Sequence, residues 1–203
     1  CALPIFNNSR VFKSRLYGHR AGHTGRVEIF LAEQMGDSGW RALVRPGRKL
    51  PPGTVVEFAP HFRAVIEERL EHGERRVRLQ APDVWAAIDA HGHMPLPPYI
   101  HRADDAADGE RYQTVYAKER GSVAAPTAGL HFTPEVLARC AEAGAERAEV
   151  TLHVGLGTFQ PLHSTVVEEN TLHFERYRVA VQEAARIRAA RRVIAVGTTR
   201  SEE

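Results

Sequence analysis

Arg26-Val-Glu-Ile-Phe-Leu31 alternates apolar and polar side chains, which is the pattern of a β-strand with one buried face. Short runs of similar character follow at residues 40–45, 55–58, 64–66 and 76–79. Gly- and Pro-containing turns separate these runs, for example Gly36-Asp-Ser-Gly39 and Pro51-Pro-Gly53. Short strands at this spacing are typical of a small antiparallel barrel or sandwich.

The pattern changes after Met94-Pro-Leu-Pro-Pro-Tyr99, which we interpret as a stiff extended linker. Residues 104–109 are acidic and polar, and we expect a surface loop there. Beyond them we predict a helix over 134–143 that Thr133 caps, a strand over 149–154, a helix over 182–191 and a buried strand over 193–196. Alternating helices and strands indicate an α/β unit. We therefore expect a barrel domain at residues 10–90, inserted into an α/β domain made of residues 1–9 and 91–203.

The two ends of the chain resemble the middle of a domain. Cys1 rather than Met begins the sequence, and only six residues follow the strand pattern that ends at Gly197. We expect a fragment truncated at both ends; an edge strand at a natural terminus is the alternative.

The composition excludes a disordered tail, a collagen and a coiled-coil rod. Hydrophobic residues make up 43% and charged residues 26% of the 203 residues, which is ordinary for a soluble globular chain. No apolar run approaches the length of a membrane span. The formal net charge is only +2, so any contact with nucleic acid must come from a local patch. Two cysteines without a CxxC pair suggest a reducing compartment, and we expect a cytoplasmic protein.

Three segments place polar, Gly and aromatic residues beside regular elements: residues 111–117, 124–133 and 150–161. In the second segment Pro126, Thr127 and Gly129 force an irregular backbone just before a capped helix, where an anion would be favoured. His131 lies at this junction and could transfer protons near neutral pH, although its ring could simply bond to the loop.

The third segment contains Gly155-Leu-Gly157 after a strand, a weak likeness to a nucleotide-binding loop. Pro161 argues against a helix directly after it, so the glycines are better explained by close approach of backbone to a ligand or a strand. His153 precedes them and is a second candidate for acid–base chemistry, or a histidine bonded within the sheet. Further along, His173 and Glu175 would share one face of a strand, where the carboxylate could orient the imidazole or pair with an arginine.

A metal site is not expected. His131, His153, His163 and His173 include no closely spaced pair of ligands, and no cysteine accompanies them.

Basic residues gather in the first third of the chain, with Tyr17 and Trp40 among them. They could contact a phosphate backbone or form an ordinary solvated face. The candidate RNA-binding residues are Arg10, Arg15, Arg45, Arg48 and Lys49.

Taken together, these segments resemble the S-adenosylmethionine:tRNA ribosyltransferase-isomerases of queuosine biosynthesis. The resemblance rests on Arg111-Tyr-Gln-Thr-Val-Tyr-Ala117, Pro126-Thr-Ala-Gly-Leu-His-Phe-Thr133 and Thr151-Leu-His-Val-Gly-Leu-Gly-Thr-Phe159. It covers residues 7–199. Two departures stand out: the family's Asn-Asp-Thr-Arg reads Asn7-Asn8-Ser9-Arg10, and Asn170 replaces the first histidine of a His-x-Met-His-x-Glu pattern.

The resemblance implies an α/β domain interrupted by a six-stranded antiparallel β-barrel. It implies transfer and isomerisation of the ribosyl group of S-adenosylmethionine onto 7-aminomethyl-7-deazaguanine at the wobble position of a tRNA, giving epoxyqueuosine, adenine and methionine. S-adenosylmethionine is then a co-substrate, no returning cofactor is needed, and we expect a monomer. The catalytic candidates are His131, His153 and Glu175. The substrate-binding candidates are Tyr112, Gln113, Thr114, Pro126, Thr127, Gly129, Gly155, Gly157, Thr158 and His173.

Two alternatives stay open at the level of sequence. One is a methyltransferase that uses the same sulfonium donor, suggested by Gly155-Leu-Gly157. The other is an RNA-binding fragment without activity.

Overall fold

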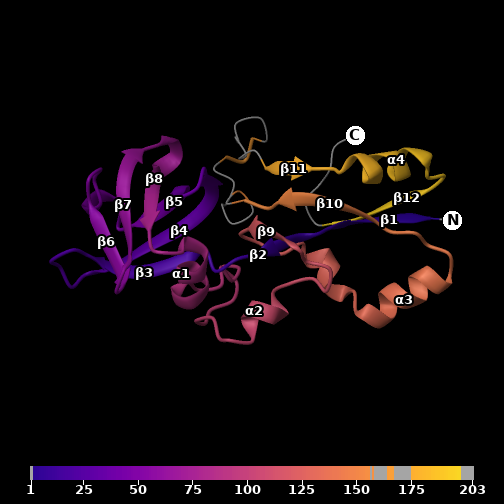
Figure 1. The fold of residues 1–203 in the computed structure, drawn as a ribbon, viewed down its shortest axis with the longest axis horizontal. Helices are drawn as coiled ribbons and strands as arrows, with labels where there is room; N and C mark the ends of the chain where they lie inside the picture. Colours follow the sequence, from indigo (N-terminus) through magenta and orange to yellow (C-terminus); the bar gives the residue numbers. More distant parts are fainter. Residues whose placement is uncertain (1, 156, 158–163, 167–174, 198–203) are drawn as a thin grey trace. The chain divides into compact units, whose positions relative to one another are not determined.

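A computed structural model describes residues 2–155, 157, 164–166 and 175–197. The chain divides into two compact units, Phe12–Pro95 and residues 1–11 together with 96–203 (Figure 1). The division therefore falls within the Pro-rich stretch 94–99. It lies a few residues beyond the predicted boundaries, because the segment after the last barrel strand packs with the barrel: Lys13 Nζ donates to Asp89 O at 2.7 Å, and Arg15 and His93 exchange backbone hydrogen bonds.

The first unit is a closed barrel in the strand order β3-β4-β5-β8-β7-β6, and every neighbouring pair is antiparallel. Its strands are β3 (Arg15–Arg20), β4 (Arg26–Met35), β5 (Gly39–Arg45), β6 (Val55–Ala59), β7 (Phe62–Arg69) and β8 (Glu74–Gln80). The short 3-10 helices η1 (Gly47–Lys49) and η2 (Glu71–Gly73) connect strands, and α1 (Val84–His91) follows β8. The predicted six-stranded antiparallel barrel is thus confirmed.

Alternation places one side of each strand in the barrel core, as in β5, where Trp40, Ala42 and Val44 are buried. Trp40 packs between Phe12 and Trp85, with ring centroids 5.4 and 5.3 Å away. Asp83 caps α1 by accepting a hydrogen bond from Ala86 N.

The second unit is α/β, as predicted. Its main sheet has the order β11-β10-β1-β12, in which β1 is parallel to β10 and β12 while β11 is antiparallel to β10. These strands are β1 (Leu3–Asn7), β10 (Ala148–His153), β11 (Arg176–Arg178) and β12 (Val193–Val196). A separate parallel pair joins β2 (Ser9–Val11) to β9 (Glu119–Ser122). The helices are α2 (Asp108–Arg111), η3 (Thr127–His131), α3 (Pro134–Glu142) and α4 (Val181–Ala189).

Two local predictions hold only in part. Residues 104–109 are not simply a surface loop: Asp108 begins α2 and is only 4% exposed, because Arg102 and the backbone of Asp105 satisfy its carboxylate. The strand at 193–196 forms, but it is not buried. It lies at the edge of the sheet, and Val193 remains 45% exposed.

No helix in the described part of the chain is long and apolar enough to cross a membrane.

Candidate functional site

The candidate site lies where the main sheet divides. Strands β1 and β10 run parallel, with Asn7 opposite Val150, so their carboxyl ends meet at one edge. After Asn7 the chain leaves this sheet and pairs with β9 through β2, while β10 continues to His153. Ligands in open α/β sheets bind in such places, beyond the carboxyl ends of strands.

His153 packs against the backbone of β9. A Cβ atom on Gly121 would lie 2.8 Å from His153 Nδ1, and Gly121 has a φ of +142°, so only glycine leaves room for the ring there. The imidazole is half-buried, and Nδ1 has no hydrogen-bond partner among the described residues. Burial, and then the positive charge of Arg176, lower the pKa of His153, so the ring is neutral near pH 7.

Glu175 meets the third segment. Its Oε1 accepts a hydrogen bond from Gly155 N at 3.0 Å, which ties the start of β11 to the loop after β10. A Cβ atom on Gly155 would meet nothing within 4 Å. Of the other candidates in this region, Gly157 is half-buried, whereas Thr158 and His173 lie outside the described residues.

The first two sequence segments meet in a second cluster. A Cβ atom on Gly129 would lie 2.0 Å from Tyr116 Oη and 2.8 Å from Thr114 Cγ2, so the 126–131 turn presses directly on the 112–117 segment. Phe6 of β1 packs on Tyr116 at 4.8 Å and on Phe132 at 5.0 Å between ring centroids. Burial raises the pKa of Tyr116 to about 12, so its hydroxyl stays protonated.

Two neighbouring substrate-binding candidates, Tyr112 and Gln113, form hydrogen bonds with the backbone of other segments. Gln113 exchanges two hydrogen bonds with Val11, donating to its carbonyl at 2.7 Å and accepting from its amide at 3.0 Å. Burial raises the pKa of Tyr112, opposed by a hydrogen bond with the backbone of Ala125. Pro126 and Thr127 begin the η3 turn that carries Gly129.

His131 ends η3 and is exposed, with Nδ1 3.4 Å from Ala128 O. The start of α3 is already capped, because Thr133 Oγ1 accepts from Val136 N at 3.3 Å. A hydrogen bond with the Thr133 side chain lowers the pKa of Glu135 in the same turn, so a carboxylate already occupies the helix start. Within the described ranges, no hydrogen bond or ion pair joins His131 to His153 or Glu175.

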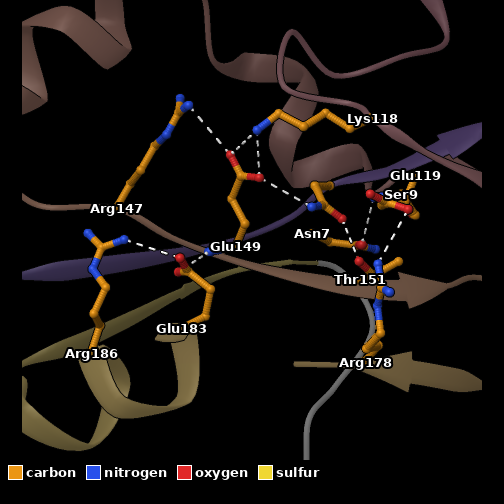
Figure 2. A network of polar contacts seen from close by, with 11 residues as sticks. Asn7, Ser9, Lys118, Glu119, Arg147, Glu149, Thr151, Arg178, Glu183 and Arg186 are labelled. Carbon is orange, nitrogen blue, oxygen red and sulfur yellow. Dashed lines mark hydrogen bonds and ion pairs between the residues drawn. The ribbon is translucent and has the colours of Figure 1, made fainter. Parts of the chain in front are cut away.

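A polar network connects the ends of β1 and β10 to their surroundings (Figure 2). Glu149 of β10 accepts from Lys118 Nζ at 2.8 Å and from Asn8 Nδ2 at 3.2 Å. Burial opposes ionisation of Glu149, but these hydrogen bonds and the charges of Lys118 and Arg147 together hold its pKa below the usual value. Asn8 also accepts from Thr151 Oγ1 at 2.8 Å.

A cavity of about 670 Å³ adjoins this network. Pro4, Phe6, Leu137 and Ala141 form apolar parts of its wall, and Lys118, Arg147, Glu149, Glu183 and Arg186 contribute charged side chains.

Three residues that sequence reasoning missed shape the surroundings of His153: Asn7, Gly121 and Ser122. Asn7 belonged to a segment that resembled the family, but its residue type alone gave no role. Gly121 and Ser122 stand in a short strand that carried no clear apolar alternation, so no sequence signal marked them.

Among the described residues, no group of three or more His, Cys, Asp or Glu side chains is placed to hold a metal ion. His163 and His173 lie outside the described residues.

The RNA-binding candidates fall on both units. Arg45, Arg48 and Lys49 are exposed at the end of β5 and in η1, and Arg10 is exposed in β2 of the α/β unit. Arg15 instead pairs with Glu28 and lies over the ring of Phe30, 4.5 Å from its centroid. Two more residues of the basic first third lie on the barrel: Arg20 Nη1 is 3.5 Å from Lys49 O, beside this group, and Arg26 stacks 4.0 Å above Tyr17.

Residues 2–202 match the family described as queuosine biosynthesis protein. An S-adenosylmethionine:tRNA ribosyltransferase-isomerase from Solibacter usitatus is 56% identical over 214 residues, which cover 96% of this chain and 61% of that protein. One from Rhodospirillum rubrum is 48% identical over 201 residues, covering 96% and 58%. The crystal structure of an S-adenosylmethionine tRNA ribosyltransferase from Thermotoga maritima is 27% identical, covers 96% of this chain and 51% of that one, and superposes with a TM-score of only 0.37. The chain thus spans about three fifths of the length of the curated relatives that it matches.

Proposed function

This chain belongs to the queuosine biosynthesis protein family, and from that premise we propose that the whole protein is an S-adenosylmethionine:tRNA ribosyltransferase-isomerase. It would move the ribosyl group of S-adenosylmethionine onto 7-aminomethyl-7-deazaguanine in a tRNA anticodon and isomerise it, so that epoxyqueuosine forms and adenine and methionine leave. S-adenosylmethionine is consumed in this reaction as a co-substrate. The observation that carries the proposal is the family match along almost the entire chain, joined to a neutral, half-buried imidazole at the carboxyl ends of two parallel strands.

The chemistry requires a base and an acid. The sulfonium makes the adjacent ribose carbon acidic, so a base must remove a proton there, and adenine leaves more readily when it is protonated. His153 suits the role of base because its lowered pKa keeps the ring free of a proton at neutral pH. His131 remains the candidate for the acid. Glu175 supports the loop after β10 through Gly155 N and is a candidate to take a second proton.

The tRNA is the proposed partner, with the precursor base at its wobble position. On the barrel, Arg45, Arg48 and Lys49 are the phosphate contacts we favour, and Arg20, beside Lys49, extends the same group. Arg10 is a separate candidate on the α/β unit. Arg15 is the weakest of the predicted contacts, since Glu28 already neutralises it. We also propose a cytoplasmic monomer.

Product analysis tests the activity with the full-length protein, S-adenosylmethionine and a tRNA that carries the precursor base. Release of adenine and methionine supports ribosyl transfer, whereas formation of S-adenosylhomocysteine would show methyl transfer. If none of these products forms, the protein only binds RNA. His153→Gln should lower the rate of adenine release by roughly 10²–10⁴-fold, the range for loss of general acid–base catalysis. His131→Gln is the matched comparison: a loss of similar size assigns both histidines, and a rate within a few-fold of wild type removes His131 from the mechanism.

Salt dependence tests the RNA contacts. Each neutralised phosphate contributes about 0.7–0.9 to the slope of log K against log salt concentration. The triple variant Arg45→Gln, Arg48→Gln, Lys49→Gln should therefore reduce that slope by roughly 2–3. The matched control neutralises three other barrel arginines, Arg63, Arg76 and Arg78, which bond to Gln80, Glu68 and Glu67. Equal slopes in wild type and the first variant would place the RNA elsewhere.

A further inference from the structure

Along one side of β10 the backbone groups have three successive hydrogen-bond partners. Residues 150, 152 and 154 present their backbone groups to the side of β1. Val150 is the last of these three residues to form a hydrogen bond with the backbone of β1 or of the residue that follows it. In that bond, Asn8 N donates to Val150 O at 2.9 Å. Because the chain then turns away into β2, the amide and carbonyl of Leu152 lose their strand partner. Buried backbone groups left in that state are costly, so something must replace it.

The side chain of Asn7 replaces it. Its Nδ2 donates to Leu152 O at 2.9 Å, and its Oδ1 accepts from Leu152 N at 3.0 Å, so one carboxamide serves both groups of a single residue as a strand would. The same Oδ1 accepts from Ser9 N at 3.1 Å, which fixes the turn into β2. Asn7 is buried, and its amide is therefore held by three hydrogen bonds out of reach of solvent.

Ser122 has a similar role at Val154, two residues after Leu152: its side chain accepts a hydrogen bond from a backbone amide of β10's continuation. Its Oγ accepts from Val154 N at 2.9 Å and lies 3.0 Å from Ala124 O, to which it donates, while Val123 N donates to Val154 O at 2.9 Å. Ser122 is fully buried. Two side chains from different strands thus clamp the residues directly before and directly after His153.

We propose that Asn7 and Ser122 are positioning residues that hold His153 in place against Gly121, where its ring can act on substrate. This inference rests on the proposed function only for the claim that His153 is catalytic; the positioning itself is independent of it. If either clamp is lost, the end of β10 loses its backbone partner, and the ring leaves the narrow space beside Gly121. The charged groups that face the ring are Arg176 and Arg178 on β11 and Glu119 on β9. The pKa of His153 therefore depends on where the ring lies relative to these groups.

The test follows the titration of the His153 Cε1–H resonance in the full-length protein, assigned through His153→Gln. Asn7→Ala and Ser122→Ala should each move the pKa of His153 from its lowered value towards that of a free histidine, because burial and Arg176 no longer act fully on the ring. The control is Thr151→Val, which removes a buried hydrogen bond from the same strand to Asn8 without touching Leu152 or Val154. It should leave the titration unchanged.

Activity supplies the second readout. Misplacement of a catalytic group by about 1 Å can cost roughly 10²-fold in rate, so kcat should fall by about 10–100-fold in Asn7→Ala and Ser122→Ala, while KM for S-adenosylmethionine changes far less. A His153 titration identical to wild type in both alanine variants, with circular dichroism showing them folded, would overturn the positioning role. So would a shift of equal size in Thr151→Val. Should His153→Gln retain full adenine release, the catalytic assignment would fall, yet the titration would still decide the positioning.

Discussion

Asp108 should carry a measurable share of the stability of the α/β unit, and its contribution should vanish in acid. Arg102 Nη1 and Nη2 donate to the two carboxylate oxygens at 2.6 and 2.7 Å, and Asp105 N donates to Oδ2 at 2.9 Å. The hydrogen bonds from Arg102 and then from Asp105 lower the pKa of Asp108 from 3.8 to about 2, against the opposing effect of burial. These hydrogen bonds of Asp108 fix the segment that leads into Tyr112, Gln113 and Thr114.

The pKa difference sets the magnitude. A lowering of the pKa from 3.8 to about 2 corresponds to about 2.5 kcal/mol of native-state stability. Because Arg102 is 45% exposed, solvent screening reduces the figure, and we expect Asp108→Asn to lower the free energy of unfolding by about 1–2 kcal/mol at pH 7. A carboxyl group whose folded pKa is depressed stabilises the protein above its unfolded pKa. The difference between wild type and Asp108→Asn should therefore persist down to about pH 4 and disappear as the pH falls towards 2.

Urea denaturation at several pH values measures this difference. Both tryptophans of the chain, Trp40 and Trp85, belong to the barrel unit, so tryptophan fluorescence follows the barrel while the tyrosine signal and circular dichroism include the α/β unit. Glu68→Gln, which breaks an exposed ion pair with Arg76, is the control and should change stability by less than about 0.5 kcal/mol. A stability loss in Asp108→Asn that is equally large at pH 7 and pH 2.5 would refute the electrostatic reasoning, as would no loss at pH 7.

Three further outcomes are expected. Gly129→Ala should cost about 1–3 kcal/mol by overpacking against Tyr116, seen as a lower denaturation midpoint, and no loss would mean that the 126–131 turn can shift freely. Trp40→Ala should destabilise the barrel by about 3–5 kcal/mol, measured by the fluorescence of Trp85, and a loss under 1 kcal/mol would contradict its place at the centre of the core. In the full-length enzyme, kcat/KM for adenine release should fall with acid only below about pH 6.5, since the pKa of His153 is lowered; an acid limb centred above pH 7 would exclude it as the base.

The sequence by itself determined five of the six barrel strands, all but β3, and the elements at 134–143, 149–154, 182–191 and 193–196. Period-two alternation in runs such as 26–31 is enough to predict barrel strands, because one face of each strand must be apolar to close a core. The helix after Thr133 was predicted from its cap and from Pro134, and α3 begins there. The family resemblance likewise came from contiguous motifs, which a linear reading detects.

Only the tertiary structure decided what surrounds each candidate residue. His131 and His153 look alike in sequence, yet one ends an exposed turn and the other is pressed against Gly121 by strand pairing. Asp108 reads as one more acidic residue of a loop until Arg102 folds over it. Asn7 and Ser122 stand more than 110 residues apart in the sequence, and they acquire a role only because β1 leaves β10 early and exposes backbone groups that a side chain must satisfy. Such long-range replacement of backbone partners leaves no local pattern, since it depends on where two distant strands part.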